Sequence, residues 1–284
     1  MIANISNFTF PENIKLTRAS FDKLHTFRNL TRLYCPRFDS VYQHHRFSGY
    51  IANYTNKFNI NPILKSLTIH GWESDRDIYS FTNLIKLKMP NTSIPTVNYF
   101  PKLKNLELRM NEYETFSECK YTSNLKILHV YVDYDDDDFI STTSILPFKQ
   151  HEWINLQKLK ITIHYLLDNL NISFPNLTSL SIEVNGDNFY IIDWKTQTKL
   201  MRLCLKNINV KDINNYLVKA VNLVKLHLTV SDNFENENIK ISHEYNSKLK
   251  YLKLKRFGKV ELINMTQLKM NDISLVGKVR IRND

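Results

Sequence analysis

The residues of this chain that could support chemistry include an acidic run from Asp133 to Asp138, interrupted only by a tyrosine. With Asp133 as the first ligand, the run has the D-x-D-x-D opening of a calcium-binding EF-hand loop. The sixth position of such a loop needs glycine and the twelfth needs a bidentate glutamate. Asp138 and Ser144 stand at those positions. We therefore interpret the run as a solvated acidic loop, with pairing to a basic surface of another copy as the alternative.

Histidine next to glutamate, at His151–Glu152 and His243–Glu244, suggests the zinc-binding helix of a metalloprotease. That helix needs a second histidine four residues after the first, and an asparagine and a serine stand there instead. The pair His44–His45 has no cysteine or carboxylate at ligand spacing. The sequence predicts no metal site and no cofactor.

The phosphate-binding and nucleophile motifs of common enzymes are missing from the sequence. It holds no G-x-G-x-x-G, no G-x-x-x-x-G-K-[ST] and no G-x-S-x-G. We predict that the protein is not an enzyme.

The composition describes a basic chain without a membrane span. It has 284 residues, 43% of them apolar, and a formal net charge of +10, which favours an acidic partner. No run of about 18 apolar residues occurs, and the N-terminus has no apolar core of a signal peptide. Three cysteines without paired spacing fit a reducing compartment. We predict an intracellular protein, cytoplasmic or nuclear.

A repeated frame, apolar-x-x-apolar-x-apolar, organises the chain. Asparagine precedes the first leucine of the frame in six segments, and an aromatic residue stands three positions before it in five. The segments begin at Leu30, Leu64, Leu84, Leu103, Leu125, Leu156, Leu177, Leu200, Leu223 and Leu249. Two fainter copies flank them, around Ile14 and around Ile273.

The alternation at the end of each frame predicts a short strand with one buried face. One such strand cannot bury its apolar face alone, whereas about a dozen stacked strands make a parallel sheet with a shared core. The residues between segments supply the crossovers that parallel neighbours need. We expect the upstream aromatic residues to fill the core where the chain re-enters the strand layer.

The frame resembles the leucine-rich repeat superfamily, whose unit is LxxLxLxxN. The resemblance implies an α/β or predominantly β solenoid, with a curved parallel sheet of about 10–12 short strands and irregular outer segments. The asparagine that follows the frame in regular members appears cleanly only at Asn111 and Asn185, so we expect its ladder to be mostly absent. We predict one domain over 1–284, with an N-terminal cap at 1–27, clear repeats at 28–260 and a C-terminal cap at 261–284.

Residues between the apolar strand positions point away from the core, and the resemblance implies that they form the concave binding side. Eleven of these thirty outward positions are lysine or arginine, and two are glutamate. The turn at Leu177 offers two serines and Glu183 instead, so two separate patches are possible. The partner-binding residues that we predict are Arg32, Tyr34, Lys86, Lys88, Arg109, Tyr131, Lys158, Lys160, Arg202, Lys206, Lys225, Tyr251, Lys253 and Lys255.

Two of the cysteines have positions in this frame. Cys35 occupies an inward strand position and is predicted to be core. Cys204 is outward, between Arg202 and Lys206, and we expect these cations to lower its pKa. No base is predicted beside it.

The predicted function is protein recognition, with a rigid scaffold that holds an acidic partner protein on its basic face. Binding of RNA or a ribonucleoprotein by the same face is one alternative. Another is the substrate receptor of a ubiquitin ligase, for which residues 1–27 leave little room for an adaptor-binding domain.

Overall fold

The computed structural model describes fifteen parts of the 284-residue chain. They are residues 13–15, 31–35, 64–69, 83–89, 100–110, 124–132, 153–163, 174–184, 198–208, 213–230, 238–257, 259–266, 268, 273–275 and 278–282. The acidic run 133–138, the surplus residues 39–59 between the segments at Leu30 and Leu64, and His151–Glu152 lie outside the described residues. The chain divides into two compact units, Met1–Met110 with Glu118–Leu125, and Asn111–Ser117 with Lys126–Asp284, which we call unit 1 and unit 2.

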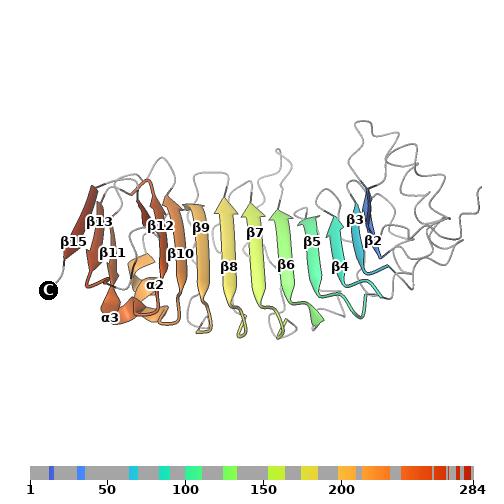
Figure 1. Ribbon diagram of the computed structural model, residues 1–284, viewed down its shortest axis with the longest axis horizontal. Helices are drawn as coiled ribbons and strands as arrows, with labels where there is room; N and C mark the ends of the chain where they lie inside the picture. Colours follow the sequence, from blue (N-terminus) through green and yellow to red (C-terminus); the bar gives the residue numbers. More distant parts are fainter. Residues whose placement is uncertain are drawn as a thin grey trace, which may run out of the picture. The chain divides into compact units, whose positions relative to one another are not determined.

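Unit 1 holds parallel strands that pair in chain order (Figure 1). They are β1 (Asn13–Lys15), β2 (Arg32–Cys35), β3 (Ser66–Ile69), β4 (Lys86–Met89) and β5 (Asn105–Met110). The leucines of the frame lie in register across them, since Leu67 is opposite Leu33 and Leu87, and Leu87 is opposite Leu106. The fainter copy around Ile14 is strand β1, as predicted.

Unit 2 repeats the same arrangement in its main sheet (Figure 1). The strands are β6 (Ile127–Val132), β7 (Lys158–Ile163), β8 (Ser179–Val184), β9 (Arg202–Ile208), β10 (Lys225–Val230), β12 (Tyr251–Lys255) and β14 (Ile273–Leu275). Each is parallel to its neighbours. Asn207, with φ 55°, is an extra residue where β9 shifts register against β10. The parallel, leucine-rich solenoid predicted from the frame is confirmed.

A second parallel sheet lies in the outer segments of the C-terminal repeats, and the frame did not predict it. It consists of β11 (Asn238–Ser242), β13 (Lys259–Ile263) and β15 (Lys278–Arg282). Helices α2 (Ile213–Lys219) and α3 (His243–Asn246) contact β11 and each other. In the described part of the chain, neither helix has the length and apolarity needed to cross a membrane.

Three of the five aromatic residues upstream of the frame are core residues that also close a turn, while Phe27 and Phe81 lie outside the described residues. Phe100, Trp153 and Phe174 are at most 2% exposed. The carbonyl of each accepts the N–H of the leucine three residues later, at 3.0 or 3.1 Å. The expected role of these aromatic residues in the core is confirmed. Asn246 replaces the aromatic residue in the last clear repeat, where it is buried and donates from Nδ2 to the carbonyl of Leu217 at 2.9 Å.

A polar ladder connects successive repeats at the position just before the first leucine of the frame. Asn222 donates from Nδ2 to the carbonyl of Thr198 in the previous repeat at 2.8 Å. Its Oδ1 accepts from Nζ of Lys248 in the next repeat at 2.6 Å. Asn176 bonds in the same way to the carbonyl of Ile154 and to Lys199. An asparagine ladder therefore exists, at a different position from the one that regular repeats use.

The backbone continues this ladder into the strands. The N–H groups of Val224 and Lys225 both donate to the carbonyl of Met201, at 2.8 and 3.0 Å. The same two-to-one arrangement joins Thr178 and Ser179 to Gln157. The repeats that begin at Leu177 and Leu223 thus start their strands with three hydrogen-bond donors, two from the backbone and one from a side chain, that face the repeat before.

Replacing Asn222 with alanine tests the ladder. Asn222→Ala removes a donor to Thr198 and an acceptor for Lys248, so we expect the free energy of unfolding in urea to fall by about 1 kcal/mol. Asn222→Asp keeps an acceptor for Lys248 but places a carboxylate oxygen where Nδ2 donated to the Thr198 carbonyl, so this variant should also be less stable than the parent. The matched control is Asn238→Ala, at an exposed strand position. Equal stabilities of the Asn222→Ala and Asn238→Ala variants would contradict the role of the ladder.

Candidate partner-binding face

The outward side chains of unit 2 form three straight rows, because the strands pair in register. The first row runs Lys158, Ser179, Arg202, Lys225 and Tyr251, and the second runs Lys160, Ser181, Cys204, His227 and Lys253. The third row runs Thr162, Glu183, Lys206, Thr229 and Lys255. Apart from Thr162 and Thr229, which are buried, these side chains are half-buried or exposed. The leucines and other apolar residues between them are buried.

Cations concentrate on strands β9, β10 and β12. Five of the nine row positions on these strands are lysine or arginine, and none is acidic. We call this group the basic patch: Arg202, Lys206, Lys225, Lys253 and Lys255. Strand β8 separates it from Lys158 and Lys160 on β7. The basic residues of β7 are therefore separated by one strand from those of β9, β10 and β12.

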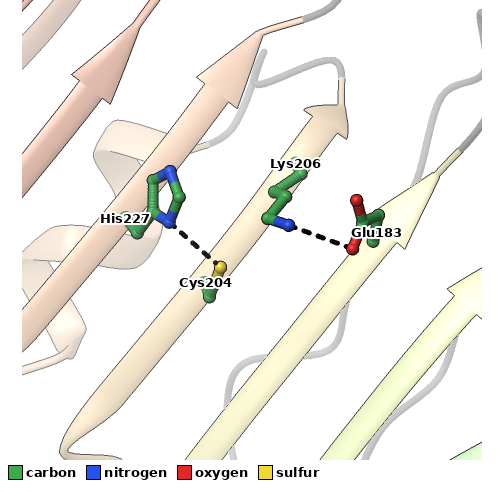
Figure 2. A network of polar contacts seen from close by, with 4 residues as sticks. All are labelled: Glu183, Cys204, Lys206 and His227. Carbon is green, nitrogen blue, oxygen red and sulfur yellow. Dashed lines mark hydrogen bonds and ion pairs between the residues drawn. The ribbon is translucent and has the colours of Figure 1, made fainter.

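Glu183 is the one acidic side chain in the three rows, and it is already paired. Its Oε2 accepts from Nζ of Lys206 at 3.0 Å (Figure 2). Both side chains are about one-third exposed, so solvent screens the pair and its contribution to stability is at most about 1 kcal/mol. Among the described residues, no carboxylate forms an ion pair with Arg202, Lys225 or Lys253.

Cys204 and His227 are neighbours at the centre of the basic patch. The Cys204 sulfur lies 3.4 Å from Nδ1 of His227 (Figure 2). Burial raises the pKa of the Cys204 thiol, and this outweighs the opposite effects of a hydrogen bond with Ser181 and of the charge on Lys206. The expectation that nearby cations lower this pKa is wrong in its net direction, because the sequence does not show how far the thiol is desolvated. The absence of a base beside Cys204 is likewise corrected.

The pKa of His227 is lowered, first by burial and then by the charges of Lys253, Lys206 and Lys255. A nucleophilic cysteine works as a thiolate, with its pKa depressed beside an imidazolium. Here the thiol is made less acidic and the imidazole less basic, so both groups stay neutral near pH 7. The pair therefore lacks the charge state of a cysteine nucleophile, and it serves as the uncharged centre of a positively charged surface.

Aromatic side chains of the face are engaged in contacts of their own. Nζ of Lys225 lies 4.1 Å above the centre of the Tyr251 ring, and the ring of Tyr131 lies 4.2 Å from that of His129. A cation–π contact at a partly exposed site is worth about 0.5–1 kcal/mol. It fixes the position of Lys225, while Tyr251 stays 43% exposed.

Unit 1 carries the remaining predicted binding residues. Arg32 is exposed and Lys86 half-buried on the outward side of its sheet. Lys88 forms an ion pair with Glu107 on the neighbouring strand. The side chains of Tyr34 and Arg109 lie outside the described residues.

No metal centre is present among the residues that the structure describes. No three histidine, cysteine or carboxylate side chains there lie close enough to hold an ion. His243 and Glu244 stand in the short helix α3, where the N–H of Glu244 donates to Oγ of Ser242. His243 and Glu244 therefore lie in the first turn of α3.

No family model matches the chain, and no curated protein does. Among solved structures, the chain is similar to an internalin from Listeria monocytogenes, with 16% sequence identity and a TM-score of 0.47. The alignment covers 89% of this chain and 76% of the internalin chain. The function proposed below rests on the residues of this chain alone.

A titration of His227 by NMR measures the positive field of the basic patch. We expect its midpoint below the ordinary value of about 6.5. Because the unfolded chain then binds the proton more readily, the contribution of His227 to stability is lost as the pH falls below 6.5. Lys253→Gln with Lys255→Gln should raise the midpoint without restoring 6.5, since burial is the larger cause. A midpoint at or above 6.5 in the unsubstituted protein would contradict this account.

Proposed function

We propose that this chain is a non-enzymatic recognition protein of the leucine-rich repeat type. Residues 1–284 act as one scaffold, and the outward face of its parallel strands binds an acidic segment of a partner protein. The observation that carries the proposal is the excess of cations on that face. Exposure alone would enrich lysine and glutamate together, yet nine row positions on β9, β10 and β12 hold five cations and no carboxylate.

The two glutamates on the outward faces support a carboxylate as the bound group. Glu183 lies against Lys206 on the next strand, and Glu107 lies against Lys88. In both pairs, a carboxylate contacts the ammonium group at the same row position on the neighbouring strand. Aspartate and glutamate side chains of a partner would find the same geometry at Lys253 and Lys255, which are exposed. Such contacts steer association more than they add affinity.

The contacts made by the aromatic side chains of this face favour a protein ligand over RNA. Binding of single strands without sequence preference combines a basic groove with open aromatic rings on which bases stack. The ring of Tyr251 has the ammonium of Lys225 above it, and the ring of Tyr131 packs on His129. The face therefore offers cations for ion pairs more readily than platforms for bases.

Charge reversal on the face provides the test. A bait with Lys158, Lys160, Lys253 and Lys255 changed to glutamate should lose acidic partner proteins that the unsubstituted bait retains after ribonuclease treatment. All four side chains are on the outward face, so the circular dichroism spectrum and the urea midpoint should stay close to those of the parent. Quantitative mass spectrometry of the captured proteins is the measurement.

A control bait carries the same four-charge change elsewhere, at Lys219, Lys240, Lys250 and Lys259, which are exposed and lie outside the three rows. We expect it to retain the acidic partners. Equal capture by the face variant and the control variant would refute the assignment of the face. Capture that disappears with ribonuclease would favour the RNA interpretation instead.

A further inference from the structure

The basic patch is a ring around a neutral centre. Cys204 and His227 are opposite each other on β9 and β10, in the middle row. Arg202 and Lys206 lie two residues before and after Cys204, Lys225 lies two residues before His227, and Lys253 is opposite His227 on β12. With strands about 4.8 Å apart and about 3.3 Å per residue, each of these four Cα atoms is about 7 Å from the midpoint between Cys204 and His227.

The two groups at the centre of this ring carry no negative charge, and the one carboxylate whose charge acts on them, Glu183, is paired with Lys206. Cys204 and His227 are held as neutral groups, and the position beyond His227 in the third row is Thr229, which is uncharged. The charges of Lys206, Lys253 and Lys255 all act on His227, so the fields of two of these four cations and of the nearby Lys255 overlap at the centre. One compact anion above Cys204 and His227 is therefore within the field of cations from three strands.

A single carboxylate is a poor match for such a ring, because one negative charge engages one or two cations. A phosphate monoester carries about −1.5 to −2 charges at pH 7 and presents three acceptor oxygens. It engages an arginine through two parallel hydrogen bonds and lysines as point charges. The number of cations and their placement on different sides of one point suit this dianion better.

We infer that the ring of Arg202, Lys206, Lys225 and Lys253 around Cys204 and His227 binds a phosphorylated side chain in the acidic segment of the partner. This inference rests on the proposed function and adds a specific binding site to it. Carboxylates of the partner segment lie along the outward rows, and the phosphate lies at the centre of the ring. Lys206 exchanges Glu183 for a phosphate oxygen. The ring thereby makes recognition depend on phosphorylation of the partner.

Peptide binding to the full chain, followed by fluorescence anisotropy, tests the inference. The probes are two labelled twelve-residue peptides of alternating glutamate and glycine, identical except for serine or phosphoserine at the centre. We expect the phosphoserine peptide to bind about tenfold more tightly. Arg202→Gln with Lys225→Gln and Lys253→Gln should bring the ratio of the two affinities close to one. The matched control, Lys219→Gln with Lys240→Gln and Lys259→Gln, should leave the ratio unchanged.

The NMR signal of His227 reports whether the phosphate of the peptide binds at the centre of the ring. Addition of the phosphoserine peptide should raise the pKa of His227, since a dianion at the centre favours the imidazolium. The serine peptide should raise it less.

Binding of both peptides with a ratio near one in the unsubstituted protein would overturn the phosphate-binding site and leave the proposed function standing. Binding of neither peptide would overturn both. A tenfold preference that survives in the Arg202, Lys225 and Lys253 variant would place the phosphate elsewhere and refute the ring. Inorganic phosphate that competes as strongly as the phosphoserine peptide would also refute the inference, because the acidic segment would then contribute nothing.

Discussion

The fold depends on the hydrogen bonds that each repeat makes to the one before it. A parallel strand of three to seven residues has no partner within its own repeat, so its backbone groups are satisfied only by its neighbours. Strands β8 and β10 begin where two N–H groups share one carbonyl of the preceding repeat, and the amides of Asn176 and Asn222 donate beside them. This junction sets the register, and the register sets the rows. Cations that are about 23 residues apart in sequence become neighbours for that reason alone.

Much of this arrangement follows from the sequence. The period-two alternation after Leu177 or Leu223 is enough to predict a strand and to say which side chains point outward. The shared frame then predicts the register of the rows, and the described strands pair in that register. The second sheet did not follow, although NIKIS and KVELI alternate too. Their pattern is short and lacks the leading leucine. It predicts a strand only when a pairing strand in the next repeat is already known.

The contact between Cys204 and His227 and the pKa shift of Cys204 could not be predicted from the sequence. Cys204 and His227 share a row, which made them neighbours in principle, but a contact of 3.4 Å depends on side-chain rotamers that no pattern specifies. The direction of the Cys204 pKa shift depends on a balance between burial and charge, and burial wins. Charge can be counted along a sequence, whereas desolvation requires the packing of neighbouring strands. The polar ladder shows the same limit, since its asparagines were visible as a repeated residue without a visible bonding partner.

Glu183 gives the basic face a built-in competitor. Its carboxylate is tethered one strand away from Lys206, so its effective concentration at that ammonium far exceeds that of any free carboxylate in solution. A visiting group with one negative charge gains nothing by taking its place, because it would trade one equivalent ion pair for another. A visitor with more charge, or with several charges on one backbone, can displace it. Under the proposed function, the pair would therefore exclude small acids with a single negative charge, because such acids cannot displace Glu183.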